Sequence, residues 1–228
     1  MTGFVAGTLV HTDKGLVPIQ EIKVGDWVLS RPELGGKDAP TEYKRVTRAF
    51  CFGEDELIRL SCQRDSEYDN TDAPIYIEFI TPNHPIWDES LKEWIPASEI
   101  EIGTLLSSID NEDNLRVLSI EYVYKGYINN NILIGGCFDI SFGNEDGQEL
   151  DMLIQFNNDN YLIHFNQYNE SYSVDKDKYI KLEQDLVGKV ADGCYGFDRL
   201  KLKVQVYNLE IEDHPTYFVG HDGIWVHC

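Results

Sequence analysis

The sequence predicts an all-β protein, and three observations support this prediction. Apolar and polar residues alternate over short runs, which are separated by turn signals rich in glycine, proline, asparagine and aspartate. Thirteen tyrosines and ten phenylalanines among 228 residues favour strands. No long run has the spacing of an amphipathic helix, and residues 175–186 are the one candidate for a short helix. The hydrophobic fraction of 42% is typical of a globular chain that buries one core, with or without an inserted subdomain.

The first part of the chain is expected to consist of strands joined by tight turns. Residues 4–12 and 16–19 flank the turn Asp13-Lys14-Gly15, so they predict a hairpin. Gly25-Asp26 turns the chain into another strand, and residues 31–42, with two prolines and two glycines, are expected to form a loop. The further strands expected before residue 125 cover residues 45–52, 56–62, 75–80, 95–100 and 102–106.

Residues 126–195 differ from the rest in composition. They are rich in asparagine and acidic residues, yet residues 152–156 and 161–165 keep the apolar alternation of strands. We expect an inserted acidic β-rich subdomain that the core does not need for folding. The core is then formed by residues 3–125 and 196–228, whose last strands are expected at residues 202–211, 217–220 and 224–228.

The formal net charge of −21 limits the classes of partner. An acidic surface repels nucleic-acid phosphate and anionic lipid, so neither nucleic acid nor membrane is expected as a partner. The start of the chain lacks the basic flank and long apolar stretch of a targeting segment, and no apolar run reaches membrane-spanning length. The acidic balance itself indicates a well-solvated surface or a basic partner.

The cysteines do not indicate a metal or disulfide framework. Their number is odd, their spacing is wide and no CxxC pair occurs, so reduced thiols are expected. His214, His221 and His227 match no spacing of a helix-face or finger-type metal site. No metal and no cofactor are therefore expected. The five cysteines are Cys51, Cys62, Cys137, Cys194 and Cys228.

Four segments, in this order, resemble the sequence blocks of Hint (Hedgehog/intein) self-processing domains, of the bacterial intein-like kind found in polymorphic toxins. The opening block is Phe4-Val5-Ala6-Gly7-Thr8-Leu9-Val10 together with Gly25-Asp26-x-Val28-Leu29. The second is Thr81-Pro82-Asn83-His84 and its neighbours, the third spans residues 206–219, and the last is Trp225-Val226-His227. Together the blocks cover residues 3–30, about 79–106 and 204–228.

This resemblance implies a horseshoe-shaped all-β fold with its two ends side by side, and it implies self-processing chemistry. A thiol at the first residue of such a domain attacks the carbonyl before it and converts the amide into a thioester; a terminal asparagine then cyclises and cuts the peptide bond after it. The implied partners are the flanking N- and C-terminal segments of the same precursor, including a toxin effector. The implied location is the bacterial cytoplasm during synthesis, followed by secretion or display on the cell surface.

The resemblance also assigns roles to individual residues. His84 would hydrogen-bond and protonate the leaving amide nitrogen, while Thr81 would orient the scissile peptide or its oxyanion. Asp213 would steer the first step and His214 the second, and His227 would polarise the carbonyl of the downstream junction. The structural alternatives are a strand end at Thr81, a turn at His84, an Asx turn at Asp213 before Pro215 and an ordinary strand residue at His227. The other three histidines match no block position and are expected to be structural: His11, His164 and His221.

Two positions depart from the blocks and predict an inactive chain. Gly3 stands where the nucleophilic cysteine is expected, either because glycine has replaced it or because a cysteine after Gly3 is missing. His227 is followed directly by Cys228, which occupies either the asparagine position or the position after the junction. Without a thiol at one end and an amide side chain at the other, neither reaction is expected.

Two other classes of function compete with a single-turnover self-processing domain. An acidic β protein is also suited to be a binding module, such as an inhibitor or immunity-like partner of a basic protein, in which case the histidines would be scattered. A conventional cysteine hydrolase would use Cys51, Cys62, Cys137 or Cys194, none of which lies in a nucleophile motif. The arrangement of the two chain ends around His84 distinguishes these alternatives.

Overall fold

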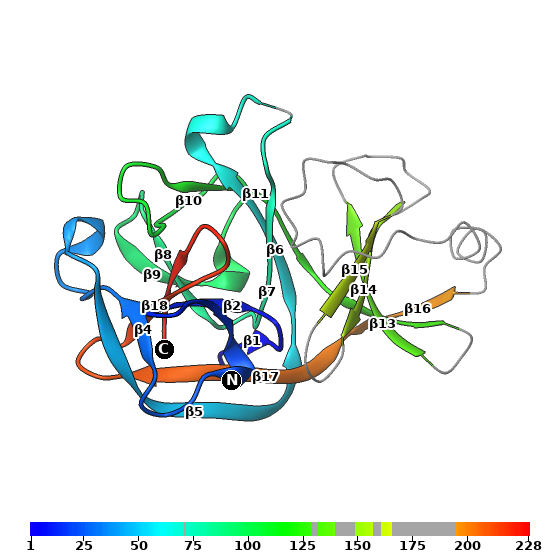
Figure 1. Cartoon of the computed structure of the whole chain (residues 1–228). Helices are drawn as coiled ribbons and strands as arrows, with labels where there is room; N and C mark the ends of the chain where they lie inside the picture. Colours follow the sequence, from blue (N-terminus) through cyan, green and yellow to red (C-terminus); the bar gives the residue numbers. More distant parts are fainter. Residues whose placement is uncertain (71, 129–131, 140–148, 157–160, 166–194) are drawn as a thin grey trace.

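The computed structural model describes residues 1–70, 72–128, 132–139, 149–156, 161–165 and 195–228, and confirms the all-β prediction (Figure 1). These residues form strands and single-turn 3-10 helices, and no α-helix occurs among them. The short helix expected over residues 175–186 lies outside the described residues.

The larger of two sheets is formed by strands between residues 4 and 122 and between residues 203 and 227, so β16, most of which the sequence assigns to the core, lies in the second sheet instead. Its strand order is β10-β11-β6-β7-β1-β17-β5-β4-β2-β18-β19-β8-β9; β3 pairs with β2, and β10 also pairs with β8. This last pairing connects strands near the two ends of the order, so the sheet curls round and encloses a core. Its strands are β1 (Phe4–Val5), β2 (Leu9–Thr12), β3 (Gly15–Pro18), β4 (Trp27–Ser30), β5 (Glu42–Glu56), β6 (Ile58–Arg64), β7 (Tyr76–Ile80), β8 (Pro85–Asp88), β9 (Glu93–Pro96), β10 (Leu105–Leu106), β11 (Leu115–Tyr122), β17 (Lys203–Ile211), β18 (Thr216–Val219) and β19 (Ile224–His227).

Several boundaries differ from the sequence prediction. The strand expected at residues 45–52 is part of the fifteen-residue β5, because β17 pairs along it from Val46 to Glu56. The strand expected at residues 95–100 ends at Pro96, where a 3-10 turn begins. The short helical turns are η1 (Ile19–Glu21), η2 (Gly36–Asp38), η3 (Asp65–Glu67) and η4 (Ala97–Glu99).

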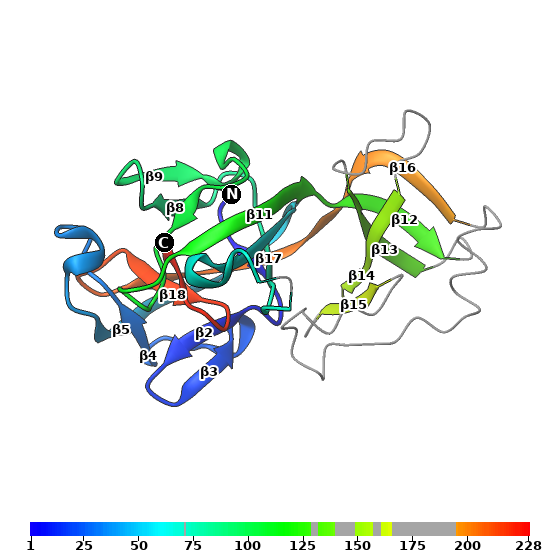
Figure 2. The same ribbon diagram turned by 90° about the horizontal axis from the view of Figure 1, so that it is seen from above.

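The second sheet lies beside the larger one and has the order β15-β14-β13-β12-β16 (Figures 1 and 2). The chain enters it after Val123 and leaves it before Leu202, and the Leu202 N–H donates to the Val123 carbonyl at 2.8 Å. Entry and exit are therefore adjacent. Its strands are β12 (Tyr124–Ile128), β13 (Ile132–Asp139), β14 (Glu149–Phe156), β15 (Tyr161–Phe165) and β16 (Tyr195–Lys201).

Strand β7 of the larger sheet contributes side chains to two apolar clusters, because successive side chains of a strand point to opposite faces. Ile80 belongs to the core of the larger sheet, whereas Phe79 belongs to a second apolar cluster that includes residues of the second sheet. The Phe79 ring centroid lies 5.4 Å from that of Phe156 and 5.0 Å from that of Tyr161, both edge-on. The two sheets thus share buried apolar surface.

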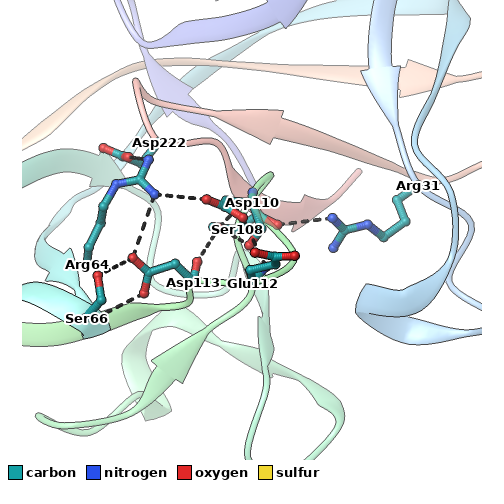
Figure 3. A network of polar contacts seen from close by, with 8 residues as sticks. All are labelled: Arg31, Arg64, Ser66, Ser108, Asp110, Glu112, Asp113 and Asp222. Carbon is teal, nitrogen blue, oxygen red and sulfur yellow. Dashed lines mark hydrogen bonds and ion pairs between the residues drawn. The ribbon is translucent and has the colours of Figure 1, made fainter.

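A polar network joins the loop after β10 to two arginines (Figure 3). Arg64 on β6 pairs with Asp110 at 3.4 Å, with Asp113 at 3.9 Å and with Asp222, which lies in the turn between β18 and β19. Arg31 donates to the Ser108 carbonyl at 3.1 Å. The loop therefore links the outer end of the β18–β19 hairpin to β6 and to the end of β4.

Candidate functional site

Gly3 and Thr81 are joined by two reciprocal hydrogen bonds. The Gly3 N–H donates to the Thr81 hydroxyl at 2.9 Å, and the Thr81 N–H donates to the Gly3 carbonyl at 3.0 Å. This pairing follows from the sheet, since Phe4 on β1 lies opposite Ile80 on β7. Both residues are buried. The peptide bond between Thr2 and Gly3 is therefore held against the start of the Thr81–His84 turn.

His84 closes this turn and is completely buried. Its N–H donates to the Thr81 carbonyl at 3.1 Å, and its ring lies edge-on to Phe4 with centroids 4.5 Å apart. Neither ring nitrogen has a hydrogen-bond partner. Burial lowers the pKa of His84 to about 3, and the two smaller effects of the neighbouring His227 oppose each other. His84 is thus a neutral imidazole at neutral pH.

The hydrogen bond to the Gly3 amide nitrogen is made by Thr81 and not by His84. The block resemblance predicts a bond from His84 to the amide nitrogen of Gly3, but the Thr81 hydroxyl accepts that N–H. The physical reason is local: Thr81 directly follows β7 and is in register with β1, whereas His84 lies one turn further along the chain. His84 instead contacts the ring of Phe4, the residue after the junction.

His227 and Cys228 bring the other end of the chain to the same region. His227 ends β19, which pairs with β8 directly after the Thr81–His84 turn. Its Nε2 lies 3.2 Å from a Glu33 carboxylate oxygen, and its Nδ1 lies 3.1 Å from the Cys228 carbonyl oxygen. Figures 1 and 2 both show the two ends of the chain close together on this side of the larger sheet.

Cys228 is held by the backbone rather than exposed as a free end. Its N–H donates to the Pro215 carbonyl at 2.8 Å, and its side chain packs against the core of the larger sheet. Burial raises the pKa of the Cys228 thiol to about 12, so the thiol is neutral.

Asp213 and His214 lie on the turn between β17 and β18, and their side chains pair with β5. Asp213 has a positive φ of 63° and an exposed side chain that pairs with Lys44 at 3.1 Å. His214 Nε2 lies 3.4 Å from a Glu42 carboxylate oxygen. The turn contacts the downstream end of the chain through the Pro215 carbonyl, which accepts the Cys228 N–H.

Two residues that the sequence did not single out take part in this arrangement. The Asn208 side-chain N–H donates to the Thr2 hydroxyl at 3.2 Å. The side-chain carbonyl oxygen of Asn208 in turn accepts a hydrogen bond from the buried Tyr217 hydroxyl at 2.6 Å. Asn208 therefore holds the residue just before Gly3. Glu33, which contacts His227, lies in the loop that follows β4. Asn208 lies within the third block and Glu33 in none, and the local sequence shows neither contact because each joins segments far apart in the chain.

The backbone around Gly3 leaves little room for a side chain. A Cβ atom at this position would lie 2.7 Å from the Tyr207 carbonyl oxygen and 3.3 Å from the Val206 Cβ. Strand β17 would have to move away by several tenths of an ångström to admit one. The described residues contain no group of three or more His, Cys, Asp or Glu side chains arranged to hold a metal ion.

The arrangement of the strands matches solved structures of inteins and of an intein-like domain. The solution structure of a bacterial intein-like domain from Clostridium thermocellum superposes with a TM-score of 0.52 at 18% identity, covering 100% of this chain and 99% of that one. The crystal structure of a DnaB intein from Synechocystis sp. PCC 6803 gives a TM-score of 0.53 at 10% identity, with coverage of 100% and 99%. The chain has an intein-like fold.

The intein-like fold is recognisable in structure and not from overall sequence similarity. The Ssp DnaB mini-intein variant M86 is similar at a TM-score of 0.51 and 10% identity, covering 100% of this chain and 94% of that one. No family model matches the sequence, and no curated protein matches it significantly. No helix in the described part of the chain is long and apolar enough to span a membrane.

Proposed function

We propose that the chain is a self-processing domain of the intein type, acting once on the precursor that contains it, and that the present sequence is inactive. The observation that carries the proposal is the convergence of both junctions on one turn. Gly3 is hydrogen-bonded to Thr81, while His84 lies between the Phe4 ring and His227. Acyl transfer between two junctions requires such proximity, because the reacting groups must reach near-attack distance.

The upstream step requires a thiol at position 3. The sulfur attacks the carbonyl carbon of residue 2, a C–S bond forms, and the C–N bond to residue 3 breaks, leaving a thioester and a free amine. Thr81 orients the breaking bond through the Gly3 N–H. Because His84 is neutral, it takes up the thiol proton before it delivers a proton to the leaving nitrogen.

The downstream step requires an asparagine after His227. Its side-chain nitrogen attacks its own carbonyl carbon, a succinimide forms, and the following segment leaves as a free amine. The His227 Nδ1 lies 3.1 Å from the main-chain oxygen of Cys228, which stands in for the carbonyl oxygen of that asparagine, the atom that develops negative charge. Gly3 and Cys228 lack the two reacting groups. We propose that an active form releases a downstream toxin effector in a bacterial precursor that is made in the cytoplasm and then secreted or displayed.

Two fusion proteins test the two steps separately. Gly3→Cys with an upstream reporter domain should release that reporter when dithiothreitol is added, and His84→Ala should slow release about 100- to 10,000-fold. Gly3→Ala is the matched control, because it meets the same crowding from Tyr207 without a thiol. A second form of the upstream fusion carries cysteine inserted between Gly3 and Phe4, because the sequence also allows that a cysteine after Gly3 is missing.

For the second fusion, asparagine is inserted between His227 and Cys228 and a reporter is attached downstream. Its release should need no added thiol, and His227→Ala should slow it while the fold is retained. Mass spectrometry of the products decides both cases. Intact precursors in every fusion, with the domain folded, would contradict self-processing and favour an acidic binding module. Undiminished cleavage in both the His84→Ala and the His227→Ala variants would show that the catalytic roles of these two histidines are wrongly assigned.

A further inference from the structure

The imidazole of His227 is enclosed by two hydrogen-bond acceptors. A carboxylate oxygen of Glu33 lies 3.2 Å from Nε2, and the main-chain oxygen of Cys228 lies 3.1 Å from Nδ1. The Trp94 ring stands edge-on to the imidazole with centroids 5.3 Å apart, which limits its rotation. A neutral imidazole has only one N–H and can satisfy only one of the two acceptors, whereas the doubly protonated ring satisfies both.

We propose that Glu33 is a positioning residue for the downstream cut. Its carboxylate accepts a hydrogen bond from the Nε2–H of the protonated His227 ring, which leaves the Nδ1–H of that ring to donate a charge-assisted hydrogen bond to the carbonyl of the residue after His227. Such a bond is stronger than one from a neutral ring, and it opposes the negative charge that forms on that oxygen when the asparagine nitrogen attacks. This inference rests on the proposed function and adds a residue that no block resemblance includes.

The loop that carries Glu33 is anchored to the hairpin that carries His227. Two residues before Glu33, the guanidinium of Arg31 is completely buried, with its carbon 5.0 Å from the Phe218 ring centroid on β18 and 5.0 Å from the Trp225 ring centroid on β19. Burial lowers the pKa of Arg31 to about 10, so the group still carries its charge at neutral pH. Glu33 and His227 are thus fixed to the same two strands.

The other groups around His227 do not replace Glu33. From the turn before β8, His84 faces it as a neutral ring, since burial lowers the pKa of His84 to about 3. From β9, Trp94 presents an uncharged ring. The next residue, Cys228, has a thiol whose pKa burial raises to about 12. Among the side chains that the structure describes, Glu33 supplies the carboxylate within ion-pairing distance of the His227 ring, and the main-chain oxygen of Cys228 is the other acceptor beside it.

The first test uses the chain as it exists. Long-range 1H–15N NMR of labelled protein reports which ring nitrogens of His227 carry protons. Across a pH series we expect the fraction of His227 rings that carry a proton on Nε2 to be lower in Glu33→Gln than in the unchanged chain at the same pH. Asp38→Asn, an exposed carboxylate in the same loop, is the control and should leave the spectrum unchanged. Identical His227 nitrogen shifts in the unchanged chain and in the Glu33→Gln variant would overturn the proposal.

The second test measures downstream release in the fusion with asparagine inserted after His227. Glu33→Gln should slow release about 3- to 10-fold at pH 8, because the pair is partly exposed and screened. The loss should shrink towards pH 6, where solvent supplies the second ring proton, and Glu33→Asp should restore part of the rate. A loss that is equal at every pH would indicate a merely structural role and contradict the proposal. A fusion that never cleaves, with the NMR signature intact, would refute the proposed function and leave the assignment of Glu33 to His227 standing.

Discussion

The hydrogen bond between the Gly3 N–H and the Thr81 hydroxyl should be measurable as stability of the unmodified chain. Thr81→Val removes the acceptor and keeps nearly the same shape, so the buried N–H of Gly3 is left without a partner. A buried polar group that loses its partner costs about 1–3 kcal/mol. For a chain of this size, each kcal/mol corresponds to a fall in Tm of about 2–4 °C. We therefore expect Tm to fall by roughly 2–12 °C.

Urea unfolding followed by tryptophan fluorescence measures this loss, and the chain offers a matched control. Thr8 is also completely buried, but its hydroxyl has no hydrogen-bond partner. Thr8→Val should therefore be neutral or slightly stabilising, with the denaturant slope unchanged in both variants. If Thr81→Val unfolds at the same urea concentration as the parent, or if Thr8→Val loses as much as Thr81→Val, the reasoning fails.

Three further perturbations should have defined results. Arg64→Ala should lower the free energy of unfolding by about 1–3 kcal/mol, because it leaves the buried Asp222 carboxylate without its counter-ion. The double variant Arg64→Ala with Asp222→Asn should recover part of this loss. If its urea midpoint is no higher than that of Arg64→Ala alone, the explanation is wrong. Because the folded pKa of His84 is lowered from 6.5 to about 3, the unfolded chain binds the extra proton first, and stability falls as the pH drops below 6.5. Between pH 7 and pH 5 the free energy of unfolding should fall by about 2 kcal/mol through His84 alone. Urea unfolding of His84→Gln should show a pH dependence that is smaller by this amount. Replacing residues 126–195 by a Gly/Ser linker should preserve a cooperative thermal transition at a lower Tm, because Phe79 loses its ring contacts; non-cooperative melting would place the segment in the core.

The sequence predicts the strands of the larger sheet well because each has a buried face and therefore an alternating pattern. It fails at β5, where Gly53 and the acidic residues around it indicate a break near residue 55. Pairing with β17 overrides that local preference and extends the strand from Glu42 to Glu56. Tertiary pairing of this kind leaves no trace in a local window of sequence.

The candidate site was predictable only in part for a similar reason. Thr81, His84 and His227 stand in segments with recognisable blocks, and the structure places these segments together. The Glu33 contact with His227 joins distant parts of the chain through an irregular loop, and no periodicity reveals it. The neutrality of His84 also depends on burial by several strands, which its neighbours in sequence do not show.

The hydrogen bond between Val123 and Leu202 separates the length of the second sheet's segment from the geometry around the two ends of the chain. The chain leaves the larger sheet and returns to it at points joined by one 2.8 Å hydrogen bond, whatever the chain does between them. Insertions or deletions between these two residues need not move β11 relative to β17, and β17 is the strand that lies against Gly3. The segment between Val123 and Leu202 can therefore change in length without displacing β17 from Gly3.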